Sequence, residues 1–256
     1  MNKLRTRKIL FSLITILVAI LVAFSPALAQ QNSFYWDYVN VNIDVQNNGD
    51  MLVTEEQKYV FTSQYSQQRY RYIRLHKVDE IKDITVTENN QVIPSTTGIK
   101  NNYIWIRWQH PLKAPESHTF LINYRVIGGL HTKNKNTLVY WKAIFAKRTA
   151  PIQNAKVRVN LPEALAGKVV DFRSFGVSAK SRQINPTAFE FIANQPVVPE
   201  QELEVQVTFP KDVLNIPESN WQREILKKII LFLPFIFLLL GIIIFIIRSK
   251  LLKNQS

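Results

Sequence analysis

Adjacent carboxylates are the first residues in this sequence whose type and spacing could do chemistry. Glu55-Glu56 and Asp79-Glu80 are such pairs, and two convergent carboxyl groups can act as general acid and base on one substrate. Neighbouring residues of a β-strand point to opposite faces, so Glu55 and Glu56 cannot reach the same substrate. These pairs therefore do not predict an acid–base site.

The histidines are the next candidates, and the chain has four of them and no cysteine. None stands in a His-Glu-x-x-His or comparable ligand spacing. His110 and His118 flank a proline-rich turn and could meet in space, although surface histidines with satisfied hydrogen bonds are the interpretation we favour. A Gly-rich phosphate loop and a Gly-x-Ser-x-Gly elbow are also absent from the sequence. We therefore predict no catalytic, cofactor-binding or metal-binding residues, no cofactor and no enzyme.

Glu55 is a charged residue at a position that the sequence predicts to be buried. It falls in phase with Val53 and Tyr59 on an otherwise apolar strand face. An unpaired charge on a buried face is costly, so a cation should meet it. Arg69, Arg71 or Arg74 could be that cation, and Arg71 is the partner we favour for a structural ion pair with Glu55. A ligand site at Glu55 is the alternative.

Arginines and tryptophans supply the candidate binding residues. Arg69, Arg71 and Arg74 form the densest basic group, which could contact anionic lipid or a cell-wall polymer; a solvated strand face is the alternative. Trp105 and Trp108 have opposite parity along their strand, so one of the two should be exposed and could stack on a sugar ring.

The elements that position these residues begin after an export signal. Residues 1–8 carry Lys3, Arg5, Arg7 and Lys8, an apolar stretch follows, and Ala27-Leu28-Ala29 ends the segment. This order predicts a signal peptide over residues 1–29. A retained anchor helix is the alternative, and both place the following domain outside the cytoplasm.

A second apolar segment, residues 229–247, contains no charge and is long enough to cross the lipid bilayer. We expect a linker and juxtamembrane segment over 210–228, a transmembrane helix over 229–247 and a short cytoplasmic tail over 248–256. The chain is then a single-pass protein of the cytoplasmic (inner) membrane. Most of the formal net charge of +13 flanks the apolar segments, since residues 30–220 hold 22 Lys and Arg against 18 Asp and Glu. This distribution argues against nucleic-acid binding, which needs basic residues clustered on a folded face.

Residues 30–209 alternate apolar and polar side chains with the period of a β-strand. The clearest example is Leu203, Val205, Val207 and Phe209 against polar neighbours. We predict strands over 39–45, 51–61, 69–75, 81–88, 103–108, 119–126, 137–142, 156–161, 169–175, 188–192 and 202–209. The predicted fold is all-β, an antiparallel β-sandwich that is immunoglobulin-like in general architecture. One domain is favoured over two subdomains divided near 143–154.

Several motifs in this order resemble one bacterial family. They are VQNNGDMLVTEEQKYVF, the strand that contains Tyr124, the Tyr140-Trp141 pair and a strand ending at Leu161-Pro162. With Gly49, Val53 and Glu55 they resemble the predicted membrane proteins defined by domain of unknown function 2207. The resemblance implies an exported β domain followed by membrane helices, and it implies no activity.

Together these patterns predict a β domain held outside the cytoplasm by residues 229–247 in the lipid bilayer. We expect a protein-interaction or scaffolding module at the cell envelope, with another envelope protein as its partner. A glycan- or cell-wall-binding module is the alternative.

Overall fold

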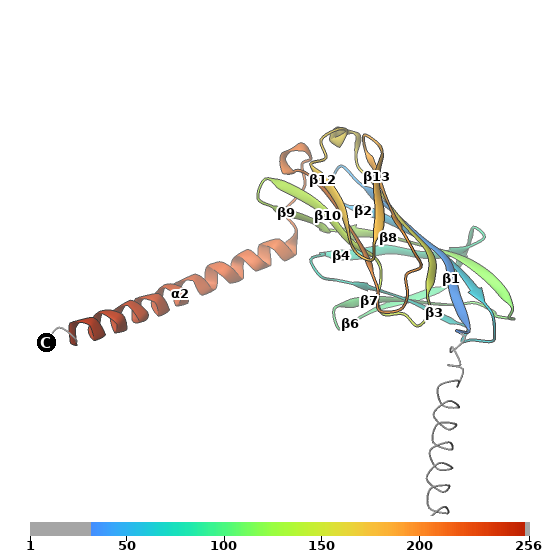
Figure 1. Ribbon diagram of the computed structural model, residues 1–256, viewed down its shortest axis with the longest axis horizontal. Coiled ribbons are helices and arrows are strands. Elements are labelled where there is room, and N and C mark those ends of the chain that lie inside the picture. Colours follow the sequence, from blue (N-terminus) through green and yellow to red (C-terminus); the bar gives the residue numbers. More distant parts are fainter. Residues whose placement is uncertain (1–31, 254–256) are drawn as a thin grey trace, which may run out of the picture. The chain divides into compact units, whose positions relative to one another are not determined.

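The computed structural model of the chain describes residues 32–253, and the predicted signal peptide lies outside the described residues. Figure 1 shows a β-rich body and one long C-terminal helix, α2. The strands are β1 (Phe34–Val45), β2 (Met51–Phe61), β3 (Gln68–Arg74), β4 (Glu80–Glu88), β5 (Gln91–Ile93), β6 (Ser95–Lys100), β7 (Tyr103–Gln109), β8 (Glu116–Ile127), β9 (Leu130–Lys133), β10 (Asn136–Ile144), β11 (Ile152–Asn160), β12 (Asp171–Gly176), β13 (Ala179–Asn185), β14 (Ala188–Ala193) and β15 (Leu203–Pro210). The prediction of a mostly β chain with one C-terminal apolar helix is confirmed.

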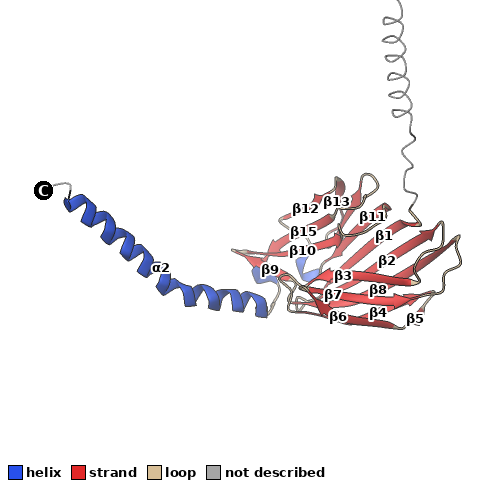
Figure 2. Ribbon diagram, turned by 90° about the horizontal axis from the view of Figure 1, so that it is seen from below, coloured by secondary structure: helices blue, strands red, loops and turns tan. Residues whose placement is uncertain are grey.

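The strands form three sheets (Figure 2). An eight-stranded sheet has the order β13-β14-β11-β1-β2-β8-β4-β5, a four-stranded sheet has the order β12-β15-β10-β9, and a three-stranded sheet has the order β3-β7-β6. All neighbouring strands are antiparallel except β1 and β11, which pair in parallel. The wholly antiparallel arrangement expected from the sequence is therefore wrong at this one pair, which joins strands from the two halves of the chain in one sheet.

Each strand predicted from periodicity is present, and the structure adds β5, β6, β9 and β13. The predicted strands bury alternate side chains; in β2 the buried and partly exposed positions alternate almost without interruption. The added strands are short or largely exposed. Because they have no buried apolar face, they carry no period-two signal and could not be predicted from periodicity.

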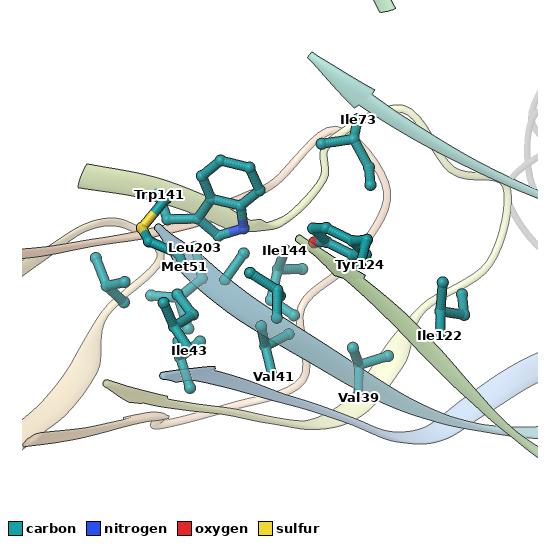
Figure 3. Close-up of a cluster of buried hydrophobic side chains, with 14 of the residues drawn as sticks. Val39, Val41, Ile43, Met51, Ile73, Ile122, Tyr124, Trp141, Ile144 and Leu203 are labelled. Carbon is teal, nitrogen blue, oxygen red and sulfur yellow. The ribbon is translucent and has the colours of Figure 1, made fainter. Parts of the chain in front are cut away.

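The buried face of the eight-stranded sheet packs against both smaller sheets, and Figure 3 shows part of the resulting core. The ring centroids of Tyr124 on β8 and Trp141 on β10 lie 6.3 Å apart. Trp108 on β7 lies 5.5 Å from Phe120 on β8 by the same measure. These contacts hold the four-stranded and three-stranded sheets against the same neighbour.

Arg148 connects the segment between β10 and β11 to the loop that precedes β15 by hydrogen bonds. Its guanidinium donates hydrogen bonds to the carbonyl oxygens of Phe145, Val197, Val198 and Gln201. Burial lowers the pKa of Arg148 to about 10. One side chain therefore satisfies backbone groups from two loops that are far apart in sequence.

Helix α2 (Asn220–Lys253) begins nine residues before the predicted membrane segment. The structure therefore places the second half of the predicted linker, residues 220–228, in the helix. Residues 220–244 are long and apolar enough to cross a membrane, with a mean hydropathy of 2.5 in their most apolar window. This helix is the one candidate span in the part of the chain that the structure describes.

The first turn of α2 is held by the β domain. The carboxylate of Asp79, between β3 and β4, accepts hydrogen bonds from the backbone N–H groups of Asn220 and Trp221 at 2.8 and 3.0 Å. Free N–H groups at a helix start need such an acceptor. The indole Nε1 of Trp221 donates to the carbonyl oxygen of Gly128 at 2.7 Å. Gly128 has a φ of +66°, and an added Cβ would lie 2.5 Å from the Asp79 carboxyl carbon, so a side chain there would displace the cap.

Replacing Asp79 by Ala should release this first turn. Loss of a helix cap costs about 1 kcal/mol, and we expect faster hydrogen–deuterium exchange at the amides of Asn220 and Trp221. Glu80→Ala is the matched control, because Glu80 is an exposed acidic neighbour. Equal exchange in the Asp79→Ala variant and the unsubstituted chain would contradict the cap.

Candidate functional site

Strand parity divides the five predicted binding residues between two faces of the three-stranded sheet. Arg69, Arg71 and Trp108 point inward and are 3%, 2% and 1% exposed. Arg74 and Trp105 lie on the outer face. The structure therefore does not bring these five residues together in one binding site. The inward and outward groups have to be considered separately.

Arg71 meets Glu55 between the eight-stranded and three-stranded sheets. The Nε atom of Arg71 lies 2.7 Å from Oε2 of Glu55, and Nη2 lies 2.7 Å from Oε1. This two-pronged geometry is the strongest arrangement for an arginine and a carboxylate. The guanidinium also lies over the ring of Phe145, 4.5 Å from its centroid. The structure thus places the predicted pair in direct contact, with both side chains buried.

Two further side chains hold the Glu55 carboxylate. The hydroxyl of Tyr124 donates to Oε1 at 2.7 Å, and the amide of Gln57 donates to Oε2 at 2.8 Å. Tyr59 in turn donates to Gln57 at 3.1 Å. Burial raises the pKa of both Tyr59 and Tyr124, which keeps their hydroxyl groups protonated as donors. Three side chains therefore donate hydrogen bonds to the Glu55 carboxylate, and this geometry suits a structural role.

Arg69 lies in the same inner layer but faces aromatic rings. Its Cζ atom is 4.5 Å from the ring centroid of Phe61, 5.4 Å from that of Tyr65 and 5.7 Å from that of Tyr59. Its Nη1 donates to the carbonyl oxygen of Gln68 at 2.7 Å. Desolvation lowers the pKa of Arg69. Cation–π contacts stabilise this buried charge, so Arg69 is part of the packing and not of an open surface.

His110 and His118 do meet, with ring centroids 4.3 Å apart. Satisfied surface histidines were the favoured expectation, whereas His110 is buried at 4% exposure, because the Pro-rich turn brings both rings onto Phe120. His118 also contacts Glu88 and Glu116 at 2.6 and 3.1 Å. Within residues 32–253 no group of three or more histidine and acidic side chains has the arrangement of a metal site.

The outer face of the three-stranded sheet gathers aromatic and cationic side chains. Its outward aromatic residues are Tyr70, Tyr72, Tyr103 and Trp105, and its outward cations are Arg74, Lys100 and Arg107. None of the three strands contains an acidic residue. Tyr70 and Tyr72 are 41% and 50% exposed, respectively. We call this outer face of β3, β7 and β6 the aromatic–cationic face.

The sheet register aligns the central row of the face. Tyr72, Trp105 and Gly98 are direct neighbours on β3, β7 and β6. A Cβ added at Gly98 would lie 2.5 Å from the indole of Trp105, so the indole lies directly over the glycine. A side chain at position 98 would push the ring off the sheet. Glycine at this position therefore lets Trp105 lie against its neighbouring strand.

Other side chains hold the rings and the cations in place. Tyr70 and Tyr72 stack with ring centroids 6.0 Å apart and an interplanar angle of 13°. The Arg107 guanidinium lies 5.9 Å from the Trp105 ring centroid and donates to Thr96 at 3.2 Å. Rings and cations that are held before a ligand arrives lose less freedom on binding.

Sequence reasoning missed most of this face, including Tyr70, Tyr72 and Arg107. A usable signal was present in the segments RYRYIR and YIWIRW, where every second residue is aromatic or basic. We grouped Arg69, Arg71 and Arg74 by their proximity in sequence. Parity separates Arg74 from the other two, because alternate residues of a strand share a face.

Residues 37–209 match the family model described as "Predicted membrane protein (DUF2207) N-terminal domain". The chain belongs to this family. The match confirms the resemblance drawn from the sequence, and it includes the aromatic–cationic face and the Glu55–Arg71 pair. A search of the curated proteins finds no match.

Solved structures resemble this DUF2207 chain only distantly. Leukotriene A4 hydrolase from Saccharomyces cerevisiae has 11% sequence identity and a TM-score of 0.43, over 72% of this chain and 31% of that one. An M1 zinc metallopeptidase from Deinococcus radiodurans has 12% identity and a TM-score of 0.43, over 68% of this chain and 43% of that one. The chain thus spans less than half the length of these proteins.

A double-substitution cycle measures the contact between Glu55 and Arg71. Glu55→Gln or Arg71→Met leaves one buried charge without its partner, and each should lower the free energy of unfolding by about 3–5 kcal/mol. The double variant should lose clearly less than the sum of the two. Denaturant unfolding followed by tryptophan fluorescence gives these values.

The exposed pair Arg173 and Asp171 provides the control cycle. Removing either member should change the free energy of unfolding by about 1 kcal/mol or less, with little coupling. Additive losses at Glu55 and Arg71 would show that the two side chains do not act as a pair.

Proposed function

We propose that this DUF2207 protein is a membrane-anchored binding module of the cell envelope that holds a glycan on its aromatic–cationic face. The observation that carries the proposal is the group of outward rings on this sheet face, formed by the exposed Tyr70 and Tyr72 and the partly exposed Trp105. Flat aromatic rings offer an apolar surface to the faces of sugars, while polar edges hydrogen-bond their hydroxyl groups. Gln68 and Gln109 lie at one end of the same face and supply such polar groups.

A binding role agrees better with the placement of the charged groups than a catalytic one. The buried carboxylate of Glu55 is occupied by Arg71, Tyr124 and Gln57. Glu56 lies on the opposite face of β2 and accepts hydrogen bonds from Tyr38 and Asn40. The adjacent carboxylates therefore do not converge on a common point.

A protein partner, which the sequence analysis favoured, is the second candidate. It is supported by the consecutive edge strands β5 and β6, which expose Val92 and Ile99 at 71% each. Edge strands carry unpaired backbone groups to which an extended peptide can add. The aromatic rings favour the glycan, because they project from the face of the sheet, whereas strand addition uses the backbone groups of an edge strand.

We also propose how the β domain is layered and on which side of the membrane it lies. We place the domain, residues 30–209, among β-sandwiches of immunoglobulin-like general architecture, with the two smaller sheets opposite the eight-stranded one. Support comes from the contacts between Glu55 and Arg71 and between Phe172 and Phe189, whose ring centroids are 5.0 Å apart. A signal peptide over 1–29 and a span over 229–247 then place this domain outside the inner membrane.

Single cysteines test the topology cleanly, because the chain has none of its own. A membrane-impermeant maleimide added to intact spheroplasts should label Val92→Cys and leave Ser256→Cys unlabelled. Both variants should react after the membrane is opened with detergent. Labelling of Ser256→Cys alone in intact spheroplasts would reverse the proposed orientation.

Removing the rings tests glycan binding. Trp105→Ala and Tyr72→Ala should each weaken retention on insoluble cell-wall glycan by about 1 kcal/mol, or about fivefold, since each removes one stacking surface. Retention is measured by co-sedimentation of the purified full chain in neutral-lipid nanodiscs. Phe175→Ala is the control, because Phe175 is an exposed aromatic residue on β12, in another sheet. Equal retention of all the variants would rule out this face as the binding surface.

A further inference from the structure

We infer that the glycan is acidic, with sugar rings on the central aromatic row and carboxylate or phosphate groups on the cations at either side. This inference rests on the proposed function and names the chemical class of its ligand.

The cations flank the central row on both sides. Arg107 lies in the row of Tyr70 and Thr96, and Arg74 and Lys100 lie in the row of Tyr103. Alternate residues of a strand are about 7 Å apart, so these two rows are separated by about 14 Å with the Tyr72–Trp105 row between them. A ligand that covers the central rings and reaches both sets of cations must be an extended chain that carries more than one negative group.

The face contains nothing that neutralises these cations from within. β3, β6 and β7 hold no aspartate or glutamate. The described part of the chain shows no ion pair for Arg74, Lys100 or Arg107; Arg107 has a neutral hydrogen-bond partner in Thr96. Some other surface cations of the domain do have carboxylate partners, as Lys58 has in Asp37 and Lys142 in Glu202. Like charges left unpaired on one face attract a ligand of the opposite sign.

The rings distinguish an acidic glycan from a simple anion. A small anion would need only the cations, and it would gain nothing from the rings of Tyr72 and Trp105. An anionic lipid surface would also meet the cations, and Tyr and Trp are common at membrane interfaces. We commit to the glycan because the aromatic row lies between the two sets of cations, which matches a chain of rings with charged groups along it. The lipid surface is an outcome of the test.

The experiment compares two ligands that share one sugar backbone. Oligogalacturonic acid carries a carboxylate on each ring, and its fully methyl-esterified form carries none. Binding of both to the full chain in neutral-lipid nanodiscs is measured by calorimetry at low and high salt. The unsubstituted chain should bind the acid form about tenfold more tightly at low salt, and high salt should remove most of this preference.

Variants with altered charge test whether the preference for the acid form comes from the aromatic–cationic face. Arg74→Gln/Lys100→Gln/Arg107→Gln should bind both forms with the affinity that the unsubstituted chain has for the ester, since each exposed pair contributes about two- to fivefold. Arg74→Lys/Arg107→Lys keeps the charge and should retain the preference. Lys156→Gln/Arg158→Gln/Lys180→Gln makes the same change of charge on the exposed side chains of β11 and β13 and should also retain it.

The outcomes separate the inference from the proposed function. Equal binding of both forms by the unsubstituted chain would overturn the acidic ligand and leave glycan binding in place. Loss of the preference in the β11 and β13 control would overturn the assignment to this face. Binding of neither form, together with Arg74-, Lys100- and Arg107-dependent binding to phosphatidylglycerol vesicles, would replace the glycan by a lipid surface and overturn both.

Discussion

The ion pair between Glu55 and Arg71 constrains the domain strongly, because it places two opposite charges where water cannot solvate them. Glu55 belongs to β2 in the eight-stranded sheet and Arg71 to β3 in the three-stranded sheet, so the pair joins two sheets that share no backbone hydrogen bonds. A buried charge is tolerated only where its partner is correctly placed. The position of β3 over β2 is therefore tied to the geometry of this pair, and Tyr124 and Gln57 restrict it further.

The aromatic–cationic face follows from the inner face of the same strands. Since side chains alternate along a strand, Arg69, Arg71 and Ile73 point into the core, and Tyr70, Tyr72 and Arg74 must then point out. The same relation holds in β7, where buried Ile106 and Trp108 alternate with Trp105 and Arg107. A shift of one residue in the pairing of β3 would bury the tyrosines and expose the arginine that Glu55 needs. The core thus determines which residues any ligand meets.

Attachment to the candidate membrane span also depends on side chains outside the helix. Asp79 accepts the first N–H groups of α2, and Trp221 reaches back to Gly128 and to the ring of His131, 5.4 Å away. Burial lowers the pKa of His131 to about 4, so this ring is neutral at physiological pH and packs as an aromatic side chain. The segment before the helix is short and partly buried at Leu214 and Ser219. These contacts make the connection to α2 a packed one, in contrast to a free linker.

The features that depend on local pattern could be predicted from the amino-acid sequence alone. Period-two alternation located the longer strands, an uncharged apolar run located the candidate span, and Glu55 on an apolar face pointed to a buried cation. Other features depend on residues far apart in the chain and follow from the packing of the whole domain: the parallel pairing of β1 and β11, the strands with little buried surface, and the start of α2 at Asn220 under the Asp79 cap. The fold also determines which rings and cations share one surface. Tyr72, Trp105 and Gly98 lie on three different strands, and the sequence of one strand does not predict its register with the others. Strand parity can be read locally, whereas neighbours across a sheet are chosen by packing of the whole core.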